Sequence, residues 1–376
     1  MPPSSDDRSS PRPPEDAGDT RSRARAGRIA VVVNGNAQSV SDEVISTLDQ
    51  ILDAGDLYIS RRIEDADAIA TNLLDRGYDT ILTGGGDGTF TVVVTSVVRE
   101  AERRARATSG GAPQRLPRFG LLRLGTGNSL AWVVGASVTG RRGPRVAKAL
   151  SADIARLRAD AGSRLLPLVE AEGILSPFCG FGVDATVLRD YNATKKAIAR
   201  GPLKHVLPGI TAYGIAAVTR TLPSYLLRPA SHCRITNRGG DAWRIGERGA
   251  TVGPPIRAGK VLYEGPATIA AVATIPYYGF GFRMFPYAEE RAGKMQLRVS
   301  TVRTFSFVKH FPEIWRGEYY NPQELFDFFV DEVEVEMDPP TSFQVGGDVL
   351  GERSRVHARL HAPIPVVDFY APPRGE

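Results

Sequence analysis

Cysteine is scarce in this sequence, and the two residues present cannot form a disulfide framework. Cys179 and Cys233 are the only cysteines among 376 residues, and they lie far apart in the chain. A disulfide-rich secreted scaffold is therefore excluded, and a reducing cytoplasm is the simplest expectation. The five histidines show no paired ligand spacing, so we expect no structural metal site.

Long hydrophobic runs are also lacking. No stretch reaches the roughly 20 uninterrupted apolar residues that a membrane-spanning helix needs. The N-terminus has no apolar segment of the kind found in a secretory signal. Residues 1–27 are instead rich in Pro, Ser, Asp and Arg. Because such a composition cannot bury a core, we predict a disordered tail.

A strong excess of one charge is missing as well. Lys and Arg number 47 against 42 Asp and Glu, which gives a formal net charge of +5. This mild basic excess suits a phosphate-rich ligand or an anionic membrane surface, and it suits an ordinary protein without a charged partner equally well. No basic helix interleaved with aromatic residues is present, so nucleic acid is not an expected partner.

The sequence does contain a regular alternation of strand and helix patterns from residue 28 onward. An apolar β-branched run at 29–33 precedes a helical pattern that Ser41 can cap. A strand at 57–63 precedes a second helical face, and two further strands end in glycine-containing turns. This order predicts an α/β nucleotide-binding domain over residues 28–163, with a parallel sheet and helices on both faces.

The pattern changes near residue 164. Short strands such as 165–171, 173–183 and 295–301 follow, separated in places by hairpin signals. Two helical stretches, near 185–200 and 206–221, interrupt them. We therefore predict a second, mostly antiparallel domain.

The most informative motif is a glycine-rich turn after a buried strand. Ile81 and Leu82 end the strand, and Gly84-Gly85-Gly86-Asp87-Gly88-Thr89 leads into an apolar helical stretch. Glycine lets the backbone approach a ligand or adopt φ > 0, and N–H groups at a helix N-terminus attract phosphate oxygens. Asp87 beside a polyphosphate indicates phosphoryl transfer, since a cation or substrate hydroxyl would then be bound there. Alternatively, Asp87 caps the helix that opens at Gly88 or Thr89.

A second turn of the same kind follows the strand that begins at Arg118. It reads Gly125-Thr126-Gly127-Asn128 and supplies a hydroxyl and an amide at the corresponding strand-to-helix position. In an open α/β sheet, ligands bind beyond the carboxyl ends of the strands. We therefore expect both turns to face one crevice.

The two turns resemble those of the diacylglycerol kinase catalytic-domain family, which includes bacterial lipid kinases and the sphingosine kinases. The family's GGDGT motif is matched at Gly85 to Thr89, and its LGTGN motif at Leu124 to Asn128. Where the family has Asn-Pro on its first strand, this chain has Asn34-Gly35, followed by Asn36. The resemblance extends more weakly over most of residues 28 to 370. It implies that Asn34, Asn36 and both turns bind nucleotide.

The resemblance also implies the architecture of the second half. A β-sandwich-like lipid-substrate domain would cover residues 164–350, and the C-terminal segment 351–376 would return to the first domain. Asp184 is similar to the aspartate of the family's GxGxDA element, which lies near the acceptor, although an acid there can also cap the next helix. The family's metal-binding Asp-Gly is replaced here, with Ala292 in place of the aspartate. Glu289 or Glu290 are the open substitutes, and the metal ligands stay unknown.

Two ways of matching the family's motif place the expected general base at different residues. The family carries Asp-Gly-Glu where this sequence has Gly346-Gly347-Asp348, and the family's aspartate is its proposed base. A gapless match puts Gly346 at the base, whereas a one-step shift in the turn lets Asp348 serve. An aspartate near the γ-phosphate could accept the hydroxyl proton, and Asp87 is a second catalytic candidate. A plain turn explains Gly-Gly-Asp equally well.

The leading hypothesis is a kinase that uses ATP and Mg²⁺ to phosphorylate a hydroxyl of diacylglycerol or of a sphingoid or ceramide-like lipid. Such a protein would be cytoplasmic and would associate peripherally with the inner face of the membrane. A homodimer stays open. Two alternatives remain: a catalytically inactive nucleotide-binding regulatory protein, and a kinase with a soluble acceptor, as in the NAD kinases.

Overall fold

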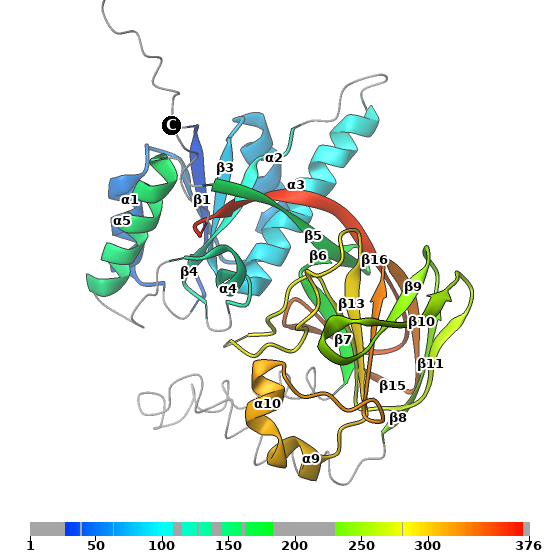
Figure 1. Ribbon diagram of the computed structural model, residues 1–376. Helices are drawn as coiled ribbons and strands as arrows, with labels where there is room; N and C mark the ends of the chain where they lie inside the picture. The colour runs from blue at the N-terminus through cyan, green and yellow to red at the C-terminus, as the bar shows by residue number, and fades with distance from the viewer. Residues whose placement is uncertain are drawn as a thin grey trace, which may run out of the picture.

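The computed structural model describes residues 27–37, 40–62, 64–107, 115–125, 128–136, 144–159, 162–182, 230–279 and 281–370. Over these ranges, an α/β half and a β-rich half are joined by long strands (Figure 1). Most of the predicted tail, the two helices expected at 185–200 and 206–221, and Thr126, Gly127 and Asp184 lie outside the described residues.

The α/β half contains a parallel sheet, as predicted. Its strands are β1 (Ile29–Asn34), β2 (Leu57–Ser60), β3 (Thr80–Gly85) and β4 (Arg118–Arg123). Its helices are α1 (Asp42–Ile51), α2 (Asp65–Asp75), α3 (Asp87–Ala107), α4 (Ala131–Val134) and α5 (Pro144–Arg158). The strands lie in the order β4-β3-β1-β2, and each neighbouring pair is parallel.

Helices cover both faces of this sheet because successive strand residues point to opposite sides. On β1, Val31 and Val33 pack in one core with α1 and α5. Ala30 and Val32 pack in another with α2 and α3. Figure 1 shows the two helix pairs on either side of the strands. Helix α1 begins as expected, since Ser41 Oγ accepts a hydrogen bond from Val44 N at 3.4 Å.

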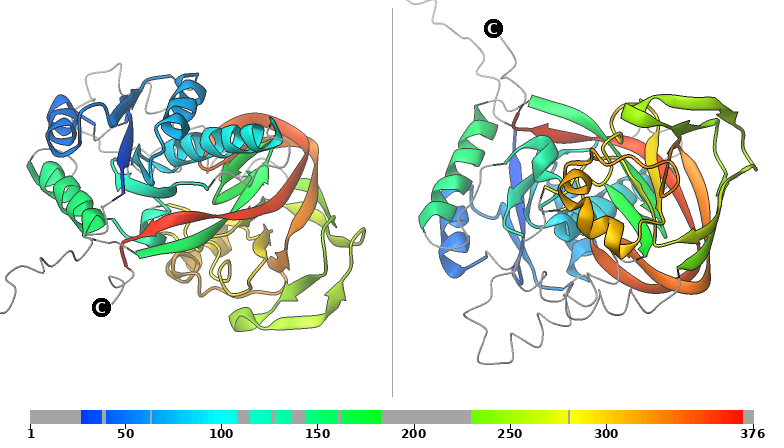
Figure 2. Two further views of the ribbon diagram at one scale, coloured as in Figure 1. Left: turned by 90° about the horizontal axis from the view of Figure 1, so that it is seen from above. Right: turned by 60° about the horizontal axis from the view of Figure 1, so that its bottom comes forward.

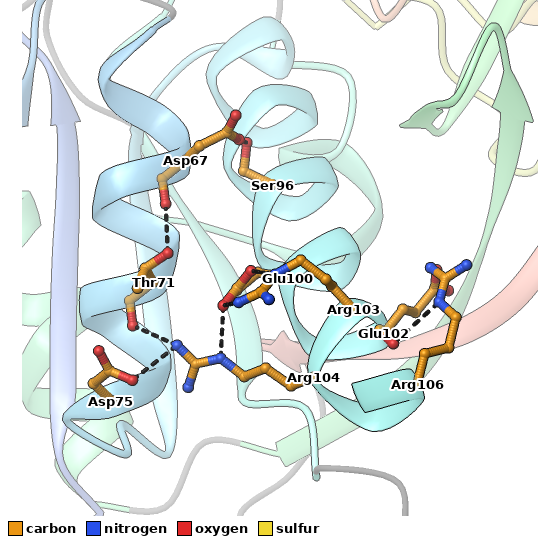
Figure 3. A network of polar contacts seen from close by, with 9 residues as sticks. All are labelled: Asp67, Thr71, Asp75, Ser96, Glu100, Glu102, Arg103, Arg104 and Arg106. Atoms are coloured by element: carbon orange, nitrogen blue, oxygen red, sulfur yellow. Dashed lines mark hydrogen bonds and ion pairs between the residues drawn. The ribbon is translucent and has the colours of Figure 1, made fainter. Parts of the chain in front are cut away.

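A polar network also ties α2 to α3 (Figure 3). Arg104 forms an ion pair with Asp75 at 2.8 Å and a second with Glu100, one turn earlier on α3, at 2.7 Å. It also donates to the carbonyl of Thr71. Nearer the start of α3, Ser96 donates to Asp67 at 2.8 Å. These contacts fix the spacing of the two helices that border the site described below.

The β-rich half is mostly antiparallel. Its first strands are β5 (Gly162–Ala171), β6 (Ile174–Ser176), β7 (Phe178–Gly182), β8 (Ser231–Asn237), β9 (Ala242–Ile245), β10 (Thr251–Ile256) and β11 (Val261–Ala267). The others are β12 (Ile269–Ala273), β13 (Met295–Ser300), β14 (Leu325–Val330), β15 (Glu332–Val345) and β16 (Asp348–Asp368). The short helices are α9 (Thr304–Lys309), α10 (Phe311–Arg316) and the 3₁₀ turn η3 (Glu247–Gly249). The predicted fold class is confirmed.

Strand β16 connects the halves. It leaves the β15–β16 hairpin, pairs next with β5, and pairs with β4 in parallel at Val366 and Phe119. Figure 2 shows β16 and β5 running side by side from one half to the other. The hairpin turn of β15–β16 is thereby held against the α/β half. No helix in the described ranges is both long and apolar enough to span a bilayer.

Several predicted boundaries were wrong. Strand β2 ends at Ser60, not at residue 63, because Asp65 accepts hydrogen bonds from the N–H groups of Arg61 and Arg62 and turns the chain into α2. The strand predicted at 173–183 is divided at Pro177 into β6 and β7. Proline has no N–H to offer a strand ladder, which explains the division.

Candidate active site

The two glycine-containing turns lie together at the carboxyl ends of β3 and β4. The strands pair in parallel register, with Gly85 opposite Arg123. A Cβ atom placed on Gly125 would overlap the Cα of Gly86, so the two backbones are in direct contact. A side chain at position 125 would therefore push the turns apart. Both turns lie at the same end of the sheet, and the described residues of the first turn alone border the cavity described below, so a crevice shared by both turns stays a prediction.

The first turn is much shorter than the sequence indicated. Gly84 and Gly85 belong to β3, α3 begins at Asp87, and only Gly86 lies between them. A Cβ atom on Gly85 would overlap the Thr89 hydroxyl, and neither Gly85 nor Gly88 has a left-handed φ. Of the two reasons for glycine that the sequence left open, close approach is therefore the one that applies at these positions.

Asp87 joins the two turns. Its Oδ2 accepts a hydrogen bond from Ser129 N at 2.7 Å, and its Oδ1 accepts one from Leu130 N at 3.1 Å. Burial raises the pKa of Asp87, while these two backbone donors lower it. The residue does act as a cap, but for the segment that leads into α4 and not for Gly88 or Thr89. With both oxygens engaged, Asp87 is better placed to hold the site together than to accept a proton.

The β15–β16 hairpin brings Asp348 to the N-terminus of α3. Gly346 and Gly347 have φ values of 59° and 89°, and Val345 pairs with Asp348 across them. Two left-handed residues in succession are typical of a tight type I′ hairpin turn, which glycine adopts without strain. The Asp348 carboxylate then lies beside Gly88, where a Cβ atom would be 2.6 Å from Asp348 Oδ2.

The side chain of Asp348 is accessible to solvent, but it lies in a cleft where protein atoms replace part of the surrounding water. This partial desolvation raises the pKa of its carboxyl group, and the negative charge of Asp87 raises it further. A carboxylate with a raised pKa is a better proton acceptor near neutral pH. The position and electrostatics of Asp348 therefore suit a general base.

Two side chains hold the turn before Asp348. Gln344 is fully buried, and its Oε1 accepts a hydrogen bond from Gly347 N at 2.8 Å. Its Nε2 donates to the hydroxyl of Tyr278 at 2.6 Å. The Tyr278 ring packs between Phe178 and Phe285, with centroids at 4.6 and 6.0 Å. Tyr278 is therefore a packing residue that also supports the turn through Gln344.

A cavity of about 230 Å³ lies next to Asp348, between α2, α3 and the ends of β1 and β2. Its polar wall includes Asn34, Asn36, Thr89 and Asp348. Asn34 Nδ2 donates to Thr89 Oγ1 at 3.4 Å and links β1 to α3. Apart from Gly88 and residues 60–62, the remaining wall is apolar and is formed by Val32, Ala66, Ile69, Ala70, Leu73, Val92, Val93 and Val97. The cavity is therefore polar where the strands end and apolar between the two helices.

Three cavity residues were missed by the sequence reasoning. Ser60, Arg61 and Arg62 border the polar end, and Asn36 Nδ2 donates to the carbonyl of Arg61 at 2.8 Å. They were missed because the strand was predicted to run to residue 63, which placed all three inside the strand and not at its end. Had the end of β2 been placed at Ser60, the rule that ligands lie beyond the carboxyl ends of parallel strands would have singled them out.

The predicted nucleotide residues divide into two groups. Asn34, Asn36, Gly88 and Thr89 border the cavity. Gly84 and Gly85 are buried inside β3, and Gly86 lies against Gly125. In the second turn, Asn128 is buried with φ of 49° and donates to the carbonyl of Gly125 at 2.8 Å. Its Oδ1 is buried and has no hydrogen-bond partner among the residues that the structure describes.

The carboxylates considered as metal ligands are used elsewhere. Glu289 pairs with Arg164 of β5 at 2.6 Å. Glu290 lies against Gly249 of η3. No group of three or more His, Cys, Asp or Glu side chains gathers around a metal-sized space in the described ranges. A protein-only metal cage is therefore not available from these residues.

Two family models match the chain in succession. The diacylglycerol kinase catalytic domain matches residues 28–157. The YegS C-terminal NAD kinase beta sandwich-like domain matches residues 179–363. This chain belongs to the diacylglycerol kinase family. Its membership supports kinase activity and the use of ATP in general terms.

Solved structures of this family share the fold. A diacylglycerol kinase from Bacillus anthracis str. Sterne is 13% identical with a TM-score of 0.54, and the match covers 91% of this chain and 97% of that one. A candidate diacylglycerol kinase from the same organism is 15% identical with a TM-score of 0.56 and the same coverage. At such identities the likeness concerns the fold alone. A search of curated proteins finds no match.

Proposed function

We propose that this family member is a lipid kinase that transfers the γ-phosphate of ATP, with Mg²⁺, to a hydroxyl of diacylglycerol or of a sphingoid or ceramide-like lipid. One observation carries the proposal: the β15–β16 hairpin places the Asp348 carboxylate over the first turn of α3, beside Gly88 and the cavity. The hairpin thus holds the Asp348 carboxylate where phosphates and an acceptor hydroxyl would meet.

Asp348, not the residue at position 346, would be the general base. Gly346 has no side chain, and a Cβ atom there would lie 2.5 Å from Thr91 Oγ1 and 2.9 Å from Ser176 Oγ. The position that a gapless match assigns to the family's aspartate is therefore closed in this chain. Asp348 would accept the hydroxyl proton of the lipid as the bond to phosphorus forms. Asp184, which lies outside the described residues, remains the proposed acceptor-orienting residue.

The cavity between α2 and α3 would hold the nucleotide. Its apolar end accommodates a base, and Arg61 and Arg62 at the polar end carry the charge to attract phosphates. N–H groups in the first turn of a helix attract phosphate oxygens, and Gly88 and Thr89 in the first turn of α3 border the cavity. Asn34, Thr89 and the second turn, through Asn128, would complete the phosphate contacts.

Mg²⁺ suits this site as a phosphate-held ion. It needs only one or two carboxylates in addition to phosphates and water, and Asp348 is the accessible carboxylate among the described residues of the cleft. When bound, the ion would neutralise charge on the transferred phosphoryl group. Because Glu289 is paired with Arg164, we do not assign it a role in metal binding.

The ion pair between Glu289 and Arg164 supports a second candidate function, a nucleotide-binding regulatory protein without catalytic activity. If the family's metal-binding element is lost at Ala292 and is not replaced, the protein could bind nucleotide and regulate a partner without turnover. The arrangement of Asp348 favours the kinase, because a binding module has no need of a solvent-accessible base beside the phosphate position.

Labelled ATP distinguishes these functions. The full chain is incubated with [γ-³²P]ATP and Mg²⁺, together with diacylglycerol, sphingoid or ceramide lipids in mixed micelles, or with soluble acceptors including NAD. We expect label in one lipid class. Label in NAD alone would support the soluble-acceptor kinase. ATP binding by calorimetry without transfer to any acceptor would support the regulatory module.

Gly88→Ala tests the contact between α3 and Asp348. The added methyl group would lie 2.6 Å from Asp348 Oδ2, so the carboxylate must move. We expect kcat to fall about 10-fold or more, because small displacements of a catalytic group are costly. Thermal stability should stay equal or rise, since alanine is favoured over glycine in a helix by about 1 kcal/mol. Thr71→Ala on α2, outside the site, is the matched control.

A further inference from the structure

A row of aromatic side chains leads outward from the site over α4, α10 and α9. We call it the aromatic row and define it as Trp132, Tyr277, Phe282, Trp315, Phe311 and Phe307. Successive ring centroids lie 5.9 Å apart for Trp132 and Tyr277, 5.3 Å for Phe282 and Trp315, 5.5 Å for Trp315 and Phe311, and 5.6 Å for Phe311 and Phe307. Gly281, next to Phe282, lies against the Trp132 ring and joins the two parts.

Three of the six side chains in the row are exposed, and the other three are half-buried. Trp132 is 41% exposed, Phe307 38% and Phe311 43%. Figure 1 shows the yellow segment before β13 between α4 and the two helices α9 and α10. Exposed aromatic side chains that gather in this way mark an interaction surface, whereas single exposed residues do not.

Cations border the aromatic row. Arg283, Arg303 and Lys309 are exposed, and none of them has a carboxylate partner in the part of the chain that the structure describes. Among the nearby carboxylates, Glu318 pairs with Arg316 at 2.7 Å, Glu313 contacts His310 at 2.8 Å, and Glu324 accepts a hydrogen bond from Ser306 of α9 at 3.4 Å. Among these described residues, the three cations without a carboxylate partner outnumber the two carboxylates without a cationic partner, so the border carries a small excess of positive charge.

We propose that the aromatic row and its cationic border form the surface by which this protein docks on an anionic lipid bilayer. Aromatic rings favour the interfacial region of a membrane, and Lys and Arg beside them are attracted to anionic headgroups. This inference rests on the proposed function, because a lipid acceptor gives the protein its reason to be at a bilayer. The row begins at α4, directly after the turn that Asp87 holds, so docking would bring the cleft to the membrane surface.

The three tryptophans of the chain allow a direct test. Trp132 and Trp315 belong to the aromatic row. Trp243 on β9 lies away from it, and its ring is covered by Arg291, whose guanidinium carbon is 3.5 Å from the ring centroid. We expect brominated phosphatidylcholine in vesicles with phosphatidylglycerol to quench the emission of Trp243→Phe. The variant with both Trp132→Phe and Trp315→Phe should lose most of that quenching. Equal quenching of both variants would overturn the proposal.

Substitution tests the binding energy. In vesicle sedimentation without ATP, the variant with Phe307→Ser and Phe311→Ser should bind anionic vesicles at least 10-fold more weakly than the unaltered protein. Val252→Ser, at a still more exposed apolar position on β10, should bind normally. Unchanged vesicle binding by the double variant would refute docking through the row. A second result would also refute it: the unaltered protein binds no vesicles but forms a dimer, and the double variant is monomeric. The surface would then be a protein interface.

A short-chain diacylglycerol below its critical micelle concentration separates this inference from the proposed function. The variant with Phe307→Ser and Phe311→Ser should phosphorylate that soluble acceptor normally and the vesicle-bound acceptor poorly. If the unaltered protein binds vesicles through the row but phosphorylates neither acceptor, the lipid-kinase proposal fails and the docking surface stands. If the unaltered protein phosphorylates both acceptors and its vesicle binding is unchanged by substitutions in the row, only the docking inference fails.

Discussion

Replacement of Asp348 by Asn is expected to lower the rate of phosphoryl transfer about 10²- to 10⁴-fold, the usual contribution of a positioned general base. The amide is nearly isosteric and keeps the hairpin turn, but it cannot accept the proton of the acceptor hydroxyl. Nucleotide should still bind, because the apolar wall of the cavity and the start of α3 are unchanged. Steady-state kinetics and Mg·ATP calorimetry measure the two properties separately.

Two further variants make this expectation specific. Glu352→Gln, at an exposed position later on β16, removes the same charge and should leave kcat within about twofold. Gly346→Asp in the Asp348→Asn background should not restore activity, because Thr91 and Ser176 occupy the space that its side chain needs. Restored activity would show that position 346 supplies the base and that the assignment of Asp348 is wrong.

The raised pKa of Asp348 predicts how activity depends on pH. Only the ionised carboxylate can accept a proton, so activity should fall as the pH decreases through the pKa of Asp348. Because partial burial and the charge of Asp87 both raise that pKa, the midpoint of the loss should lie above about 3.9, the ordinary value for aspartate. A pH profile of kcat checks this, and the acidic limb should be absent from the residual activity of Asp348→Asn.

Replacement of Asp87 by Ala is expected to have the largest effect on stability. It leaves the buried N–H groups of Ser129 and Leu130 without their acceptor. Each unpaired donor costs about 1–3 kcal/mol, and relief from burying a carboxylate offsets part of this. We expect a net loss on the order of 2–4 kcal/mol in the α/β half, together with at least 10-fold weaker nucleotide binding as the two turns separate.

Asp87→Asn provides the graded comparison. Its single amide oxygen can still accept one of the two hydrogen bonds, so its melting temperature and nucleotide affinity should lie between those of the unaltered protein and Asp87→Ala. If instead Asp87→Asn were fully stable and bound nucleotide normally but transferred no phosphate, Asp87 would be a catalytic group. That outcome would contradict the structural role assigned here. Scanning calorimetry and ATP calorimetry together separate the two cases.

Much of the fold follows from local patterns that do not depend on distant residues. The alternation on β1 separates Val31 from Val32 by pleat geometry alone, and helical spacing predicts α1 and α2 for similar reasons. The boundaries were less accurate because they depend on single contacts. Asp65, for example, ends β2 early by accepting hydrogen bonds from two N–H groups that the extended strand would have left exposed.

The sequence by itself determined the fold class, the two glycine motifs and their place at the ends of parallel strands, because these depend on residue order and near-neighbour spacing. Only the tertiary structure decided what each charged group does there. Asp87 and Ser129 are 42 residues apart, and Gly88 and Asp348 are 260 apart, so no local pattern reports their contacts. The long course of β16 brings the second pair together, and the close approach of two glycine backbones brings the first.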